Sequence, residues 1–142
     1  MTKLNSYLNF PGNAEEAFNF YKSVFGGKFA VLMRFKEVAD LPGKENLSEA
    51  DLSKIMHISL PIGDNVMMGN DSLESMGQHL KTGNVVTLSL HPDSKEEADR
   101  LYKALSQGGM SHMPMADMFW GDYWGMLTDK FGIHWMVNFH KQ

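Results

Sequence analysis

The amino-acid sequence predicts an α+β fold built from two βαβββ modules within a single domain, residues 1–142. The first observation behind this prediction is an internal repeat. A strand followed by a capped amphipathic helix occurs twice, and the two helices are related by an offset of about 81 residues. The second is the last quarter of the chain, where side chains alternate between one strongly apolar face and one mixed face.

Module 1 is expected over about residues 1–70 and opens with a strand. Apolar and polar side chains alternate along residues 4–10, with Leu4 on the apolar face. Asn13 and Glu16 have the spacing of a capping box, so a helix should begin there and end at a pair of glycines. The module therefore starts with a strand and a helix joined by a short turn.

Three further strands are expected to complete module 1. The apolar stretch 29–35 predicts one strand, and residues 54–71 predict a hairpin that turns at Gly63. A short helix capped by Ser48 is expected between them. The polar stretch 71–84 has few apolar anchors, and we expect it to connect the two modules.

Module 2 is expected over about residues 85–142 and begins in the same way. Residues 85–92 predict its first strand, with Val86 on the apolar face. Ser94 and Glu97 form a second capping-box pattern, which predicts the second amphipathic helix.

The chain ends in a predicted β-hairpin that follows a Met-rich strand over 110–118. Hairpin strands are expected over 123–127 and 133–139. The tight turn between them contains Gly132, which supplies a backbone conformation that other residues avoid. In the last strand Trp135 belongs to the apolar face, whereas the opposite face is mixed and could line a cavity.

The composition excludes several classes of partner. The chain carries 13 Lys and Arg against 17 Asp and Glu, a net charge of −4, so it lacks the basic surface that a nucleic-acid backbone requires. No apolar run approaches a membrane span in length, and the N-terminus lacks the apolar core of a signal peptide. The absence of cysteine removes disulfides and thiolate chemistry, and a cytoplasmic location is expected.

Three stretches carry a family resemblance: YLNFPGNAEEAFNFYKSVFGG at the start, ISLPIGDNVMMGND in the middle and FWGDYWGMLTDKFGIHW at the end. They resemble the PhnB-like branch of the vicinal oxygen chelate superfamily, which includes glyoxalase I, extradiol dioxygenases and fosfomycin- and bleomycin-resistance proteins. The resemblance covers nearly the whole chain, and its last stretch is the most specific. It implies mixed sheets that curl around a shared cup, usually completed in a homodimer.

The metal-dependent enzymes of this superfamily hold a divalent ion through four positions drawn from His and Glu. Carried over one at a time, these positions fall on Asn5, Met68, Val85 and Met136. None of these side chains is an imidazole or a carboxylate, which such ions require. The resemblance therefore implies a protein without the inherited metal site, and we expect neither a metal nor another cofactor.

The mixed strand faces predict what lines the cup instead. The lining is polar but nearly uncharged, with Met and aromatic surface, which suits a small neutral or amphipathic organic molecule held by a few hydrogen bonds. The candidate ligand-binding residues are Asn5, Tyr7, Asn9, His57, Ser59, Met68, Thr87, Ser89, Trp120, His134, Met136 and Asn138.

His57 and His134 are the candidate catalytic residues, because they are the histidines on the predicted cup faces. Each could act as a general base or as a ligand of a metal site that is not inherited. The competing and commoner interpretation of a lone strand histidine is a structural group with satisfied hydrogen bonds. The alternative to a metal-independent binding protein is therefore a metal-dependent lyase or isomerase, or a dioxygenase-like enzyme, with a reorganised site.

Two functions associated with the resembled branch lack support in the sequence. PhnB-like proteins often carry the label of a ubiquinone-biosynthesis methyltransferase, but no stretch resembles the glycine-rich strand-to-helix turn of a nucleotide-type cofactor site. A role in phosphonate breakdown would need cations in the cup. The two arginines, Arg34 and Arg100, are not placed there.

The stretch 110–120 contains more large apolar side chains than one face of a strand can bury inwards. This surplus predicts a homodimer in which the same patch of both subunits is buried. Trp120, with Tyr123 and Trp124, could instead form an aromatic wall for the ligand. The six side chains of the surplus are Met110, Met113, Met115, Met118, Phe119 and Trp120.

Overall fold

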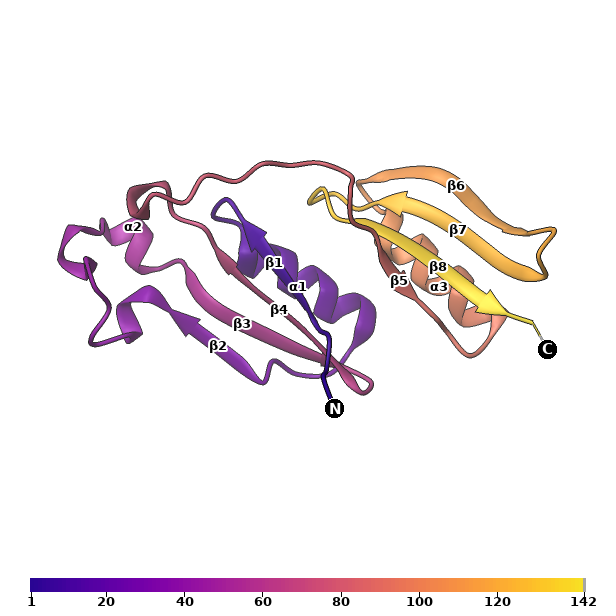
Figure 1. The fold of residues 1–142 in the computed structure, drawn as a ribbon, viewed down its shortest axis with the longest axis horizontal. Helices are drawn as coiled ribbons and strands as arrows, with labels where there is room; N and C mark the ends of the chain where they lie inside the picture. Colours follow the sequence, from indigo (N-terminus) through magenta and orange to yellow (C-terminus); the bar gives the residue numbers. More distant parts are fainter. Residues whose placement is uncertain (142) are drawn as a thin grey trace. The chain divides into compact units, whose positions relative to one another are not determined.

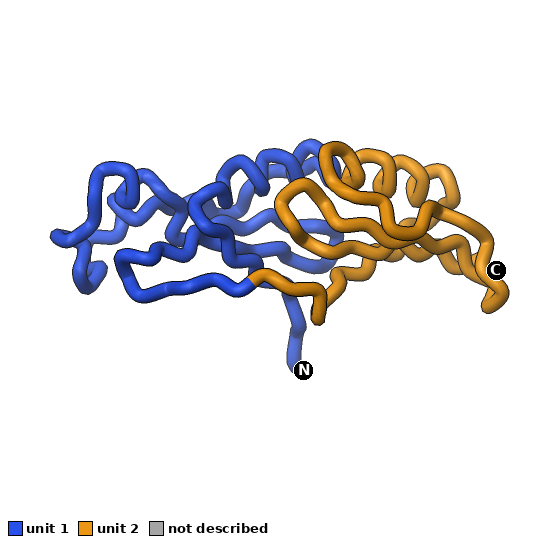
Figure 2. The backbone as a smooth tube through the Cα atoms, turned by 90° about the horizontal axis from the view of Figure 1, so that it is seen from above, with its two compact units in different colours: residues 1–81 blue, residues 82–142 orange. Residues whose placement is uncertain are grey.

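The structure is a computed structural model that describes residues 1–141. The chain divides into two compact units, residues 1–81 and 82–142, which Figure 2 shows in different colours. Each unit consists of a four-stranded sheet with one 12-residue helix packed on one face (Figure 1). The predicted α+β fold with two βαβββ-like units is confirmed.

Unit 1 has the sheet order β1-β4-β3-β2, in which β1 runs parallel to β4. Its strands and α-helices are β1 (Ser6–Phe10), α1 (Ala14–Phe25), β2 (Val31–Arg34), α2 (Glu49–Leu52), β3 (Ile55–Ile62) and β4 (Asn65–Asp71). Short 3₁₀ helices lie in the connections at Phe35–Glu37, Lys44–Asn46 and Glu74–Met76. The predicted cap at Ser48 is confirmed, because its side chain accepts a hydrogen bond from the Asp51 backbone N–H.

The helix α1 buries its apolar stripe against β3 and β4. Phe18 and Tyr21 are fully buried, and their rings pack edge to face at 5.7 Å. Phe18 lies so close to the sheet that a Cβ built on Gly69 would be 2.7 Å from its ring and 2.6 Å from the Leu8 carbonyl oxygen. Each buried aromatic ring contributes roughly 1.5–3 kcal/mol, so this contact fixes the helix on the sheet.

The capping box predicted at the start of α1 is wrong. The Asn13 side chain makes no capping hydrogen bond. Its place is taken by Asp71 at the end of β4, whose carboxylate accepts from the backbone N–H groups of Ala14 and Ile55, both at 2.8 Å. Asp71 is only 1% exposed, and it ties the helix to two strands. A distant carboxylate therefore satisfies a helix end for which a local cap was expected.

Unit 2 repeats this plan with the sheet order β5-β8-β7-β6, in which β5 runs parallel to β8. Its elements are β5 (Leu88–Leu90), α3 (Lys95–Ser106), β6 (Met110–Asp117), β7 (Asp122–Thr128) and β8 (His134–His140). The predicted offset between the helices is confirmed by their first residues, Ala14 and Lys95. Across the described part of the chain, no helix has the length and apolar character needed to cross a membrane.

The caps and the final turn of unit 2 follow the sequence closely. Ser94 Oγ accepts from the Glu97 backbone N–H at 3.1 Å, as its spacing predicts. Asp129 is 3% exposed, and its carboxylate accepts from the indole N–H of the buried Trp135 at 2.8 Å. The same carboxylate accepts from backbone N–H groups of the turn. Gly132 has φ of +88°, which confirms the predicted tight turn.

Two predictions about strand ends are wrong. The strand predicted over 85–92 covers only Leu88–Leu90, and Val86, expected on its apolar face, is 71% exposed. The pairing of β5 with β8 starts at Leu88, which is opposite Trp135, one residue after β8 begins. Leu4 likewise precedes β1 and is 92% exposed. The alternation of apolar and polar side chains therefore predicts longer strands than the structure contains.

Candidate functional site

Each sheet carries its helix on one face, and the opposite face is here called the open face. Along β7 and β8, buried side chains alternate with half-buried ones, and the half-buried set lies on the open face. The open face of unit 1 carries Tyr7, Asn9, His57, Ser59, Met68 and Asn70. The open face of unit 2 carries Ser89, Asp122, Trp124, Met126, Thr128, His134, Met136 and Asn138.

In unit 1 the register aligns Tyr7, Met68 and Ser59 across β1, β4 and β3. The Tyr7 ring stacks on His57 with 5.7 Å between centroids, and its hydroxyl oxygen lies 3.4 Å from His57 Nδ1. That O···N distance is long for a hydrogen bond, so the contact is weak. Partial burial raises the pKa of the Tyr7 hydroxyl, which therefore stays a neutral donor at neutral pH.

Amide side chains border this arrangement. Asn5 precedes β1, and its side-chain oxygen accepts from the Val66 backbone N–H at 3.1 Å. Asn9 is exposed and is the register partner of Asn70. Within residues 1–141, the buried side-chain oxygen of Asn70 has no hydrogen-bond partner. Asn70, which the sequence interpretation does not select, thus adds an unsatisfied acceptor to the predicted set.

In unit 2 the register aligns Ser89, Met136 and Met126 across β5, β8 and β7. Ser89 Oγ lies 3.0 Å from His91 Nε2, so this hydroxyl already has a partner next to it. Thr87 is half-buried and lies one residue before β5, outside the paired strand. The middle of this face is therefore made of two thioether side chains with a hydroxyl at one edge.

His134 has both ring nitrogens engaged. Its Nε2 lies 2.9 Å from the Gly83 carbonyl oxygen, and its Nδ1 lies 2.7 Å from Thr128 Oγ1, which also lies 2.7 Å from His112 Nε2. A carbonyl accepts only, so the proton of the neutral ring belongs on Nε2, and Nδ1 accepts from the Thr128 hydroxyl. Both ring nitrogens of His134 therefore have hydrogen-bond partners in the structure.

Asp122 organises the other end of the same face. Its carboxylate oxygens lie 2.5 Å from His140 Nδ1 and 3.0 Å from Asn138 Nδ2. Hydrogen bonds from His140 and Asn138 lower the pKa of Asp122, which is therefore an anion at neutral pH. The Trp120 ring packs edge to face against Trp124 at 6.0 Å, but Tyr123, the third residue of the predicted aromatic wall, is buried in the core beside Ala98 of α3.

The resemblance places the superfamily's metal-ligand positions on Asn5, Met68, Val85 and Met136, none of which has an imidazole or a carboxylate. Met68 and Met136 lie at equivalent places on the two open faces, each on the inner strand next to its parallel edge strand. Asn5 is bonded to backbone, and Val85 is 96% exposed ahead of β5. Among residues 1–141, no group of three or more His, Cys, Asp and Glu side chains could hold a metal ion.

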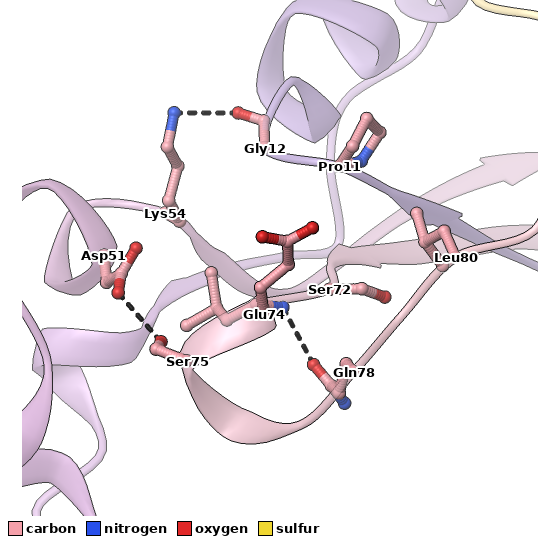
Figure 3. Close-up of a pocket in the computed structure, with 10 residues that line it drawn as sticks. Pro11, Gly12, Asp51, Lys54, Ser72, Glu74, Ser75, Gln78 and Leu80 are labelled. Atoms are coloured by element: carbon pink, nitrogen blue, oxygen red, sulfur yellow. Dashed lines mark hydrogen bonds between the residues drawn. The ribbon is translucent and has the colours of Figure 1, made fainter.

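The structure also contains a pocket of about 470 Å³ in unit 1, shown in Figure 3. None of the predicted site residues lines it; its walls come from the start of α1, from α2 and from the stretch after β4. Its polar groups bond one another: Lys54 donates to the Gly12 carbonyl at 2.9 Å, and Ser75 donates to Asp51 at 2.9 Å. We therefore place the candidate site on the open faces, which carry most of the predicted site residues.

The sequence interpretation does not select Asp122, Thr128 or His112 as site residues. Asp122 and Thr128 did carry a usable signal, because they alternate in phase with Trp124 and Met126 along β7. His112 carried none, since β6 pairs with β7 through register shifts that break the simple alternation.

Comparison with protein families gives a match over most of the chain. The family described as 3-demethylubiquinone-9 3-methyltransferase matches residues 2–138. The Escherichia coli K12 protein YjdN is 30% identical over 144 aligned residues, which cover 98% of this chain and 96% of that protein. An uncharacterised Mycobacterium bovis protein is 24% identical and is covered to 75% of its length.

Solved structures resemble the fold over nearly the whole chain. Protein PA1353 from Pseudomonas aeruginosa superposes with a TM-score of 0.87 and is 33% identical, with full coverage of both chains. A Bacillus cereus PhnB protein, titled a putative 3-demethylubiquinone-9 3-methyltransferase, has a TM-score of 0.76 and 25% identity, with coverage of 97% and 99%. A glyoxalase/bleomycin resistance protein/dioxygenase family enzyme from Burkholderia phytofirmans has a TM-score of 0.62 and 19% identity, with coverage of 96% and 98%.

Proposed function

The chain belongs to the family described as 3-demethylubiquinone-9 3-methyltransferase, the PhnB-like proteins, and on this premise we propose that it binds a small neutral or amphipathic organic molecule. The ligand lies on the open faces of the sheets and is held without the metal site of the superfamily's metal-dependent enzymes. Whether a reaction follows binding is a separate question, for which His57 and His134 are the candidate residues.

The observation that carries this proposal is the equivalent placement of Met68 and Met136. Both stand where a metal-dependent relative would present a ligand, and both supply a neutral, polarizable thioether instead. Hydroxyl, imidazole and amide groups surround each of them on its face, at positions such as Tyr7 and Asn138. An apolar centre with a few polar groups around it suits an organic molecule with limited polarity.

Methyl transfer, which the family description names, is not part of the proposal. A nucleotide-type methyl donor is usually held by a glycine-rich turn at a helix N-terminus, which favours anionic groups. Here the N-terminus of α1 is already occupied by the Asp71 carboxylate, which bonds the Ala14 N–H. A second anion at that point would be repelled by the first.

The alternative function is a metal-dependent lyase, isomerase or dioxygenase-like enzyme that uses His57 and His134. The hydrogen bonds of His134 to Thr128 and Gly83 weigh against this alternative, because a metal ligand must direct a free nitrogen lone pair at the ion. His57 has only the long contact with Tyr7 and would have to act largely alone.

The proposal is tested by titrating the full chain with N-phenyl-1-naphthylamine, a neutral amphipathic fluorophore whose emission rises in apolar surroundings. Replacing Met136→Lys puts an ammonium group into the centre of the open face, where burial against the probe is costly. We expect the probe's affinity to fall by about tenfold or more, equivalent to about 1.4 kcal/mol. Met136→Leu, which keeps an apolar side chain of similar size, should change affinity less than about threefold.

Met76→Lys is the matched control, because Met76 is an exposed methionine in the 3₁₀ helix after β4, away from the open-face residues. Its affinity for the probe should equal that of the unmodified protein. Equal affinities of Met136→Lys and Met76→Lys would contradict the proposed site.

A further inference from the structure

We propose that Asp122 assembles a subsite for a planar, uncharged aromatic group that carries a hydrogen-bond donor, with Trp120 as its stacking surface and His140 and Asn138 as its acceptors. This inference rests on the proposed function, since it specifies the kind of molecule that the open face of unit 2 binds. It adds His140 and Asp122 to the residues selected from the sequence.

The subsite is built around one carboxylate. Asp122 begins β7, and its oxygens accept from Nδ1 of His140 at 2.5 Å and Nδ2 of Asn138 at 3.0 Å. The Asp122 side chain is only 15% exposed whereas that of His140 is 71% exposed, so Asp122 holds His140 and Asn138 from beneath rather than meeting a ligand itself.

The hydrogen bonds to Asp122 decide what the other two polar groups offer a ligand. His140 gives its Nδ1 proton to the carboxylate, so the neutral ring presents a lone pair on Nε2. Asn138 commits its amide nitrogen in the same way, which leaves its side-chain oxygen as the outward group. Within residues 1–141, no further hydrogen bond engages His140 Nε2 or Asn138 Oδ1. Two acceptors without partners call for a ligand that brings a donor.

The apolar half of the subsite is the ring of Trp120, which is 49% exposed. Its position is fixed by edge-to-face packing against Phe119 at 4.9 Å and Trp124 at 6.0 Å. A held indole ring with an accessible face favours stacking with another planar ring.

The charges around the subsite favour an uncharged ligand. Asp122 is an anion, and the neighbouring Asp117 is neutralised by an ion pair with Lys141. A ligand carboxylate or phenolate would therefore meet the Asp122 anion next to two acceptors. A phenol-type hydroxyl on an aromatic ring has the required donor and no charge.

The test compares two ligands that differ only in the donor. Binding of 2-naphthol, which has a hydroxyl, and of 2-methoxynaphthalene, which has none, is measured on the full chain by ligand-observed NMR titration. We expect 2-naphthol to bind at least about fivefold more tightly, a difference of about 1 kcal/mol for one hydrogen bond. Equal affinities of the two compounds would overturn the proposal.

Variants then assign the contacts. His140→Leu should remove most of the preference for 2-naphthol, and Trp120→Leu should weaken both compounds by several-fold. His79→Leu, at an exposed histidine of unit 1, should change neither. An unchanged preference in His140→Leu would overturn the acceptor role. Because His140 and Trp120 are exposed, unaltered thermal melting is expected and is checked for each variant.

The outcome is separable from that of the proposed function. Binding of N-phenyl-1-naphthylamine could depend on Met136 while 2-naphthol and 2-methoxynaphthalene bind equally. In that case the proposed aromatic subsite is wrong, and the proposed binding on the open faces is still supported. If neither probe binds, both proposals fall.

Discussion

At the residue scale, a few buried carboxylates accept hydrogen bonds that local sequence patterns do not predict. Asp71 lies in the polar stretch expected to connect the modules, yet it is buried and bonds two backbone N–H groups. Nothing in its neighbours along the chain distinguishes it from exposed acids nearby. Only the pairing of β4 with β1 brings it to the start of α1, so its role follows from tertiary structure.

Replacing Asp71→Ala should lower the free energy of unfolding by about 2–4 kcal/mol, because the backbone N–H groups of Ala14 and Ile55 would stay buried without an acceptor. Urea denaturation measures this loss. Asp40→Ala, at an exposed acid without such bonds, should stay within about 0.5 kcal/mol of the unmodified protein. A similar small effect at Asp71 would contradict the cap.

The Tyr123 hydroxyl gives a prediction about pH. It donates to Asp99 at 2.5 Å, and this bond together with burial raises the pKa of Tyr123 to about 12 from the ordinary 10.0. The folded protein thus favours the neutral phenol, so the resulting stability is complete below pH 10.0 and is lost as pH rises towards about 12. Spectrophotometric titration should show one tyrosine with this pKa.

In Asp99→Asn the pKa of Tyr123 should move back towards the ordinary value, because the negative charge that opposes ionisation is gone. Asp93→Asn, at an exposed acid just before α3, should leave the titration unchanged. Identical titration curves for Asp99→Asn and Asp93→Asn would show that Asp99 has no part in the shift.

At the scale of elements, side-chain periodicity in the sequence predicts the helices and the final hairpin. It does not predict strand ends, which depend on the neighbouring strand in the sheet. The helices α1 and α3 and the final hairpin are where alternation and capping patterns place them. The strand β5 is shorter than its apolar run, because only Leu88, Ser89 and Leu90 pair with β8. The residue that a strand pairs with cannot be predicted from the local sequence, whereas the alternation of its side chains can.

Gly69 tests how closely α1 packs on its sheet. A Cβ at this position would overlap the Leu8 carbonyl oxygen and the buried Phe18 ring, neither of which can move freely. Gly69→Ala should therefore destabilise the protein by about 1–3 kcal/mol. Gly83→Ala is the matched control, since a Cβ there meets nothing within 4 Å. Equal denaturation midpoints of the two variants would refute the close contact.

At the scale of the whole molecule, we propose a homodimer that buries the apolar surface of β6. This edge strand exposes 62% of Met110 and 46% of Met113, and the following Phe119 is 97% exposed. Edge strands with large exposed apolar side chains generally need a partner. Light scattering should give a mass twice the 16.0 kDa of one chain.

The double substitution Met110→Lys with Met113→Lys should convert the protein to a monomer at micromolar concentration, because two ammonium groups cannot be buried in a self-complementary patch. Met76→Lys should remain dimeric. A mass of one chain for the unmodified protein would contradict the homodimer.

The candidate site was predictable only in part, and for the same reason as the fold. Period-two alternation places Tyr7, Met68 and Met136 on the faces opposite the helices, where the structure has them. The same alternation could not show that His134 is bonded to Gly83, or that Asp122 accepts hydrogen bonds from two side chains of the neighbouring strand β8. Those links join residues whose distance apart depends on the folded sheet.

The central proposal is that this chain binds a small organic molecule on its open faces without a metal ion, and native mass spectrometry of untagged protein tests it most directly. We predict that the protein retains a small uncharged organic molecule, and that Met136→Lys, but not Met136→Leu, loses it. A near-stoichiometric zinc, nickel, iron or manganese adduct that disappears in His57→Ala would contradict the proposal.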